Sequence, residues 1–190
     1  MSDAIGNDPL KQECWEKRFS SFGTAKIFED RIHSLGKKRR LITFLGLATP
    51  LTVGAFVGAY SADSPTLKLF VIPIVGAVTI IQALLSLWSI VAQWDTQYAY
   101  AVASVKSNNR LASDFEELAK ATPEKRAKGM ERLRFEYSRQ DSEDISQEIT
   151  DKEKRFGQRS ALFQYQSKCP SCGFVPKNMT STDCDSCGNY

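Results

Sequence analysis

The chain has 190 residues and a mass of 21.3 kDa, with 42% hydrophobic residues, 25% charged residues and a mean hydropathy of −0.31. These averages are typical of a soluble domain, but no charged residue occurs in 41–62 or in 69–94. Apolar stretches of this length can cross the hydrocarbon core of a bilayer as helices. The distribution therefore excludes a single water-soluble globule, and it leaves only short segments for a catalytic core.

The N-terminal segment, residues 1–40, is predicted to be an amphipathic cytosolic helix. Asp8 and Pro9 form an N-cap and a first-turn proline, and apolar residues follow at loosely helical spacing. Gly23 and Gly36 are expected to bend or end the helix. The helix either lies on the membrane surface or packs on other helices, and we favour packing because its polar face carries acids as well as bases.

A run of four basic residues, 37–40, directly precedes the first apolar stretch. Residues 1–40 carry nine Lys/Arg and six Asp/Glu, whereas residues 95–190 carry fifteen of each. Basic residues beside a span hold that flank in the cytoplasm. We therefore predict a multi-pass membrane protein with both termini in the cytosol, and we do not expect a nucleic-acid partner.

The two apolar stretches, Leu41–Tyr60 and Leu69–Trp94, predict an all-α membrane protein. Residues 41–94 would form a two-helix transmembrane hairpin in the lipid bilayer, with a short external loop at Ser61–Lys68. The turn of that loop is expected at Ser61–Pro65.

Small and uncharged polar residues recur within the two predicted spans. Small residues on one face let helix backbones approach closely, either within one hairpin or between chains of a homo-oligomer. Polar side chains in a span need a partner or water, so a ring of hairpins could line a pore with them. The candidates for helix association are Gly46, Gly54 and Gly58, and the candidates for pore lining are Gln82, Thr79 and Ser86.

Residues 95–166 are predicted to be a cytosolic helical region. Its first part is expected to continue the second span. Thr122 and Pro123 predict a new helix start, with that helix running to about Gln140. Another helix is expected to begin at Asp141.

The last 24 residues, 167–190, contain two CxxC pairs, each followed by glycine. Two such pairs form turns that can direct four thiolates at one ion, and Zn²⁺ accepts four sulfur ligands in a tetrahedron. The segment has too little apolar content to fold without a metal, so we predict a small Cys₄ zinc ribbon with structural Zn²⁺. Iron remains an alternative metal, whereas disulfides are disfavoured in a reducing cytosol. The predicted ligands are Cys169, Cys172, Cys184 and Cys187.

No catalytic arrangement is apparent in the sequence. His33 is the one histidine and no nucleophile is expected beside it, while Cys14 is interpreted as a small packed hydrophobe. We therefore do not expect an enzyme.

Together, the basic N-terminal helix, the two close spans, the helical tail and the terminal CxxC-x(11)-CxxC resemble the SLATT-type two-span effectors of bacterial conflict systems. Among these, the chain is similar to the mobilome CxxCx(11)CxxC proteins of mobile elements, because eleven residues separate Cys172 from Cys184. The resemblance implies a protein of the bacterial inner (cytoplasmic) membrane, with a pore-forming or membrane-disrupting role in anti-phage defence, downstream of a regulatory or sensor protein.

Three functions are considered on this basis. The first is an oligomeric effector that depolarises the membrane under the control of its cytosolic helices and zinc ribbon. The second is a membrane-anchored adaptor whose ribbon recruits a protein partner. The third is a metal or redox sensor that uses the four cysteines as a switch.

Overall fold

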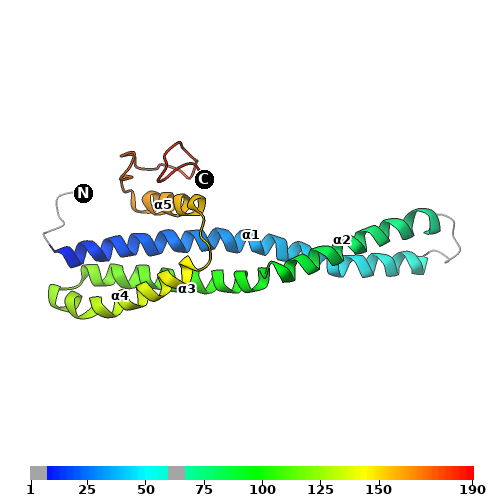
Figure 1. Ribbon diagram of the computed structural model, residues 1–190, viewed down its shortest axis with the longest axis horizontal. Coiled ribbons are helices and arrows are strands. Elements are labelled where there is room, and N and C mark those ends of the chain that lie inside the picture. The colour runs from blue at the N-terminus through cyan, green and yellow to red at the C-terminus, as the bar shows by residue number, and fades with distance from the viewer. Residues whose placement is uncertain (1–7, 60–66) are drawn as a thin grey trace. The chain divides into compact units, whose positions relative to one another are not determined.

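The computed structural model describes residues 8–59 and 67–190, which are drawn as ribbons in Figure 1. Within these ranges the chain is helical as far as Tyr165 except at short connections, and it contains no strand. Residues up to Arg31 together with Ala101–Tyr190 form one compact unit, and Ile32–Tyr100 form the other. Tyr60 and the turn predicted at Ser61–Pro65 lie outside the described residues.

Helix α1 spans Pro9–Ala59. It begins as predicted, because the Oδ1 atom of Asp8 accepts hydrogen bonds from the backbone N–H groups of Leu10 at 3.0 Å and Lys11 at 3.2 Å. Helix α1 does not end at Gly23 or Gly36, since it continues through both, so the expectation that either glycine ends it is wrong. At Gly23 the missing side chain serves close packing instead: a Cβ there would stand 3.1 Å from the carbonyl oxygen of Gly157.

The first unit has its core where the N-terminal half of α1 meets α3 (Trp94–Lys120) and α4 (Pro123–Ile145). Figure 1 shows α3 and α4 running side by side in opposite directions. Cys14 is fully buried, with its Sγ 3.7 Å from the Sδ of Met130. The N-terminal helix thus packs on other helices, and Cys14 is a packed residue. The buried core consists of Cys14, Leu111, Phe115, Ala119, Met130 and Leu133.

Helix α4 passes through the position where a new helix was predicted, so the expected helix start at Asp141 is wrong. The reason is Asp144, which is 1% exposed and belongs to the buried face of α4. Its carboxylate accepts hydrogen bonds from Ser104 and Asn108 of α3, each at 2.7 Å, and from Gln140 at 3.0 Å. This buried polar network ties the end of α4 to α3.

Helix α5 (Asp151–Tyr165) begins after Thr150. Thr150 and Glu153 form a capping box, in which each side chain accepts a hydrogen bond from the backbone N–H of the other. The chain leaves α5 through Gln166, which has a left-handed φ of 49°. The four-cysteine segment follows directly.

The second unit contains a π-helical turn, η1 (Leu67–Val71), and α2 (Ile72–Val91). Leu69–Val91 is 23 residues long with a mean hydropathy of 2.3 in its most apolar part, none of which is buried. Among the described residues it is the one helix long and apolar enough to cross a membrane. The predicted two-span hairpin therefore stays a prediction.

Contacts within the second unit show that α1 runs antiparallel to α2 and the first turns of α3. Arg39 pairs with Asp95 at 2.5 Å. Further along α1, a Cβ on Gly46 would stand 3.5 Å from the Nε2 of Gln82. The partner's residue number falls as the number on α1 rises, which defines an antiparallel pair. Figure 1 shows α2 running back along the C-terminal part of α1.

The predicted continuation of the second span into the following helix is interrupted at Gln93. This residue has a left-handed φ of 50°, and it separates α2 from α3. The side chain of Gln97 donates to the carbonyl oxygen of Ala92 at 3.1 Å, which satisfies a backbone acceptor at the break.

Candidate metal centre

The C-terminal segment folds as two tight turns, one around each CxxC pair. The backbone N–H of Gly173 donates to the carbonyl of Cys169 at 2.9 Å, and that of Gly188 donates to the carbonyl of Cys184 at 2.8 Å. Residues 167–190 form no strand, so the predicted ribbon is built from turns alone.

The two glycines are required for different reasons. Gly173 has a φ of +74°, in the left-handed region that side chains disfavour, and the space beside it is open. Gly188 lacks that backbone conformation, but a Cβ there would stand 2.1 Å from the carbonyl oxygen of Thr182. The first turn therefore needs glycine for its backbone angle and the second for space.

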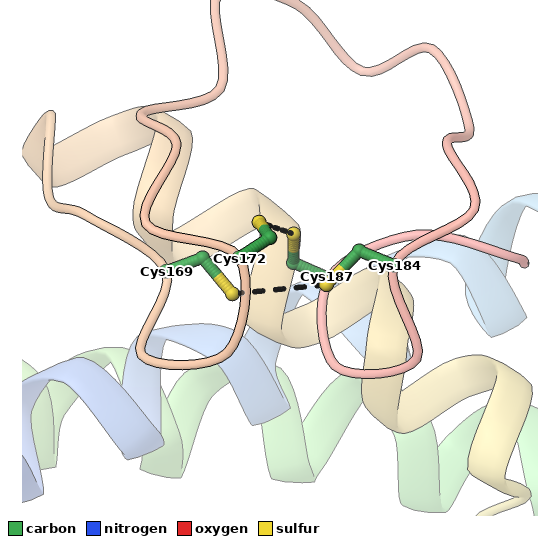
Figure 2. Close-up of side chains that lie close together, drawn as sticks. All are labelled: Cys169, Cys172, Cys184 and Cys187. Atoms are coloured by element: carbon green, nitrogen blue, oxygen red, sulfur yellow. Dashed lines mark hydrogen bonds between the residues drawn. The ribbon is translucent and has the colours of Figure 1, made fainter.

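The four cysteine sulfurs gather at one point, as Figure 2 shows. All four Sγ atoms lie within 4.8 Å of one another, with Cys169 and Cys184 3.9 Å apart and Cys172 and Cys187 3.8 Å apart. Four ligands at about 2.3 Å from a tetrahedral Zn²⁺ stand about 3.8 Å apart. The sulfurs are thus spaced for a shared ion, and the cysteines form no disulfide.

Side chains of helix α5 contact the cysteine segment and hold it in place. Arg159, 5% exposed, donates to the carbonyl oxygens of Asn178 at 3.0 Å and Cys187 at 3.2 Å. Leu162 packs against Cys169 and Cys187 in a small apolar cluster that also includes Phe19 of α1. The sulfur centre is therefore seated on the helical part of the same unit.

The thiols differ in how readily they ionise. Hydrogen bonds from the backbone N–H groups of Ser186 and Cys187 lower the pKa of Cys184 to about 7. Burial raises the pKa of the Cys187 thiol. A bound cation stabilises thiolates, so metal binding would deprotonate all four cysteines and release protons.

Access to the four sulfurs is uneven. Cys169 and Cys187 are buried, at 1% and 2% exposure, whereas Cys172 is exposed. Four thiolates fill a tetrahedral ion's coordination shell and leave no position for a catalytic water. The donor set suits Zn²⁺ and also tetrahedral iron. Structural zinc sites use a four-thiolate donor set of this kind.

The predicted membrane residues lie in the second unit. Gly46 faces Gln82, whereas a Cβ at Gly54 or Gly58 would have no neighbour within 4 Å. Gln82 and Ser86 are half-buried. Thr79 is exposed, and its hydroxyl donates to the carbonyl of Val75 in its own helix at 2.8 Å. His33 is exposed on α1.

Arg159 is a functional residue that sequence reasoning missed. It holds the loop between the two cysteine pairs by bonds to Asn178 and, at 3.4 Å, to the hydroxyl of Thr182. Helix α5 contains two arginines, Arg155 and Arg159, and nothing in the sequence distinguishes the one that has this role. Its importance follows from the way residues 178–187 return over α5.

The described structure defines an all-helical protein with a C-terminal four-cysteine metal-binding cluster and one apolar helix that can cross a membrane. The family profile described as mobilome CxxCx(11)CxxC protein matches residues 11–190, and the chain belongs to this family. The predicted family resemblance is confirmed at this level, while the wider two-span SLATT type stays a prediction. A search of curated proteins finds no significant match, and a search of solved structures finds none either.

Proposed function

We propose that the chain is a two-span protein of the bacterial inner membrane, with both termini in the cytosol. The proposal is supported by the second unit, in which polar side chains face inward and large apolar side chains face outward, the reverse of a water-soluble protein. The half-buried face of α2 carries Gln82, Ser86 and Ser89, while its large apolar side chains point outward. Water disfavours that arrangement and lipid favours it. The outward side chains, each more than half exposed, include Leu69, Phe70, Ile72, Ile74, Ile80, Ile81, Leu84, Leu87, Ile90 and Val91.

The second span of this proposal is the C-terminal part of α1. Its apolar side chains Leu41, Phe44, Leu47 and Leu51 are 56–72% exposed. The antiparallel contacts of α1 with α2 and α3 support a helical hairpin. A hairpin with both ends in the cytosol also places the basic run 37–40 on the cytosolic side.

We propose further that this membrane protein is an oligomeric effector that depolarises the membrane in mobile-element conflict. The observation that carries it is the uncharged polar set of the apolar helix, Gln82 above all. One hairpin cannot enclose a pore, so several must associate. The open sides of Gly54 and Gly58 favour contacts between chains. A regulatory partner would act through the first unit and its metal centre.

The test is membrane potential, measured with a voltage-sensitive dye in bacteria that express the full chain. Gln82→Leu should suppress depolarisation at matched protein levels, because it removes the amide from the polar face. Ile81→Leu, one residue away on the exposed face, is the control and should depolarise normally. If the chain is abundant in the membrane with its neighbouring genes present and no depolarisation occurs, the effector proposal is wrong.

The alternative function is a membrane-anchored adaptor, and the surface beside the metal centre favours it. Phe174 is 77% exposed, and it borders a cavity of about 610 Å³ that also reaches Cys172 and Cys184. An exposed aromatic side chain beside a cavity suits a protein partner. In this case an unrelated transmembrane hairpin could replace residues 41–91 without loss of function, whereas Phe174→Ser would abolish it.

A further inference from the structure

The second unit contains a pocket that none of the functions above uses. The pocket has a volume of about 590 Å³. It is lined by Tyr98 of α3 and by eight residues of α1: Ile32, His33, Gly36, Arg39, Arg40, Thr43, Phe44 and Leu47. We call it the junction pocket, because it lies where the basic run of α1 gives way to apolar residues. Its lining from Gly36 to Leu47 extends about 17 Å along the helix.

The polar end of the junction pocket holds two arginines in different states. Arg39 is fixed by its ion pair with Asp95 and by the ring of Tyr98, 4.4 Å from its guanidinium carbon. Arg40 folds back along α1, where its Nε donates to the carbonyl of Gly36 at 3.3 Å. Arg40 has no ion pair with any residue that the structure describes. Its guanidinium is therefore available to an anion.

The space at this end depends on Gly36. A Cβ at that position would stand 3.7 Å from the ring of Tyr98 and 3.8 Å from the Nη2 of Arg40. These are ordinary contact distances, so alanine fits and a larger side chain would fill the pocket. The absence of a side chain thus opens the floor of the pocket beside the Arg40 guanidinium.

The other end of the junction pocket is apolar. Phe44 and Leu47 follow Arg40 at helical spacing on the same face of α1, and they are 66% and 64% exposed. On the N-terminal side of these residues, Lys38 of α1 lies over the ring of Trp94 at 5.2 Å, just beyond the end of the apolar helix. Aromatic and basic residues of this kind gather at the level of lipid headgroups.

We propose that the junction pocket binds one anionic phospholipid, with its phosphate on the guanidinium of Arg40 and an acyl chain along Phe44 and Leu47. The proposal rests on the membrane placement argued above. Guanidinium groups bind phosphate through two parallel hydrogen bonds, which a general attraction of basic residues to the membrane does not require. The site therefore predicts selectivity that depends on shape as well as charge.

The experiment uses the full chain purified in a neutral detergent, with bound lipids counted by native mass spectrometry. Phosphatidylglycerol and phosphatidylcholine are added in separate titrations. We expect one phosphatidylglycerol per chain, retained in preference to phosphatidylcholine. Gly36→Leu should weaken this binding by roughly tenfold or more because it fills the space for the headgroup. Arg40→Gln should weaken it by a similar factor because a charged hydrogen bond is lost.

Two matched variants separate the site from general charge effects. Lys37→Gln and Lys38→Gln each remove one charge from the same basic run, and neither residue lines the pocket. Both should bind phosphatidylglycerol within roughly threefold of the unaltered chain. If Lys37→Gln weakens binding as much as Arg40→Gln, or if phosphatidylcholine binds equally well, the site is overturned. Displacement of the lipid by millimolar inorganic phosphate would overturn the lipid assignment in favour of the free anion.

Alkaline extraction of cell membranes distinguishes this inference from the proposed function. All of these variants should remain in the membrane fraction, because none alters the apolar helices. Failure of the unaltered chain to remain there would overturn the membrane placement itself. Retention in the membrane without lipid selectivity would overturn the lipid site alone.

Discussion

The glycines that follow the two CxxC pairs have the same sequence context but different surroundings, and this difference is testable. Gly188→Ala would place a Cβ against the backbone of Thr182, which cannot move aside as a flexible side chain can. Gly173→Ala would meet only the cost of a left-handed residue, about 1 kcal/mol. We expect Gly188→Ala to lower zinc affinity much more than Gly173→Ala, as measured by competition with a chromophoric chelator.

Equal losses of affinity in the two glycine variants would contradict this account. They would mean that the backbone of Thr182 yields, or that the second turn rearranges when the metal binds. Loss of metal in Gly173→Ala alone would reverse the assignment of the two roles.

Glu153 makes stability depend on pH. Its partial burial acts to raise its pKa, but hydrogen bonds from Arg31 and Thr150 outweigh that effect and lower the pKa from 4.5 to about 2. A folded-state pKa below the unfolded value stabilises the fold above pH 4.5, and the contribution is lost as pH falls toward 2. Because the pair is partly exposed, we expect about 1–2 kcal/mol rather than the full value of the shift.

The measurement is thermal unfolding of the full chain in detergent, followed by circular dichroism. Glu153→Gln should lower Tm by a few degrees at pH 7, and the difference should shrink below pH 4.5. Glu131→Gln, at an exposed position of α4, is the control and should change little. A difference for Glu153→Gln that is the same at pH 7 and pH 3 would show that the charge is not its cause.

At the scale of elements, the contact of α5 with α1 depends on two glycines that face each other. A Cβ on Gly157 would stand 2.8 Å from the carbonyl oxygen of Gly23 and 2.9 Å from the side chain of Ile27. Gly157→Ala must therefore push the helices apart, at a cost of about 1–3 kcal/mol. We expect a lower Tm for this variant in detergent.

A matched control for that substitution exists in α4. Gly129→Ala would also meet a close neighbour, the Cδ1 of Leu118 at 2.8 Å, but this is the end of a flexible side chain. Alanine also favours a helix interior by up to about 1 kcal/mol over glycine. Gly129→Ala should leave Tm unchanged or raise it, and a loss as large as that of Gly157→Ala would contradict the account.

The apolar helix Leu69–Val91 can be tested as a membrane span in the same manner. Replacing Ile80 and Leu84 with arginine should release the chain from alkaline-washed membranes, because each arginine at a span's centre costs about 2.5–3.5 kcal/mol. Phe135→Arg is the control: Phe135 is 71% exposed but lies on α4 in the first unit. Two results would argue against Leu69–Val91 as the membrane anchor: release of both the double arginine variant and the Phe135→Arg control, or release of neither.

At the scale of the whole molecule, the metal centre should stabilise the first unit without affecting membrane anchoring. The cysteines share an apolar cluster with Leu162 and Phe19, and residues 167–190 form no strand or helix of their own. Removing the ion with a chelator, or replacing Cys169 with serine, should loosen this segment and expose the cluster. Limited proteolysis should then cut within 167–190.

The corresponding control is membrane association of the chelated protein. We expect it to stay in the membrane fraction, since Leu69–Val91 belongs to the other unit. Full resistance of the C-terminal segment to proteolysis after chelation, with loss of metal verified, would show that the metal does not organise it.

Much of the site could be predicted from sequence because its information is local. Each CxxC pair brings two sulfurs together within one turn, so a shared ion follows from the spacing of Cys169, Cys172, Cys184 and Cys187. The cap at Asp8 and the apolar character of Leu69–Val91 are local in the same sense. The predicted family resemblance rests on this spacing too.

The wrong predictions concern residues whose environment is set by distant parts of the chain. Gly23 is a candidate helix end by sequence, but α1 does not end there, and its bare backbone accommodates Gly157, far along the sequence. The run at Asp141 looks like a helix start, but α3 supplies the donors that keep Asp144 buried within α4. A local propensity of a few tenths of a kcal/mol yields to such packing.

What the sequence by itself determined is therefore the inventory: an apolar helix, a basic run beside an apolar stretch, and four cysteines spaced for one metal ion. What only the tertiary structure decided is how these parts are supported. Arg159 and Leu162 seat the metal centre, and Gly36 with Arg40 opens the junction pocket. The physical reason is that turns and apolar runs depend on neighbouring residues, whereas burial and cavities depend on side chains brought together from different helices.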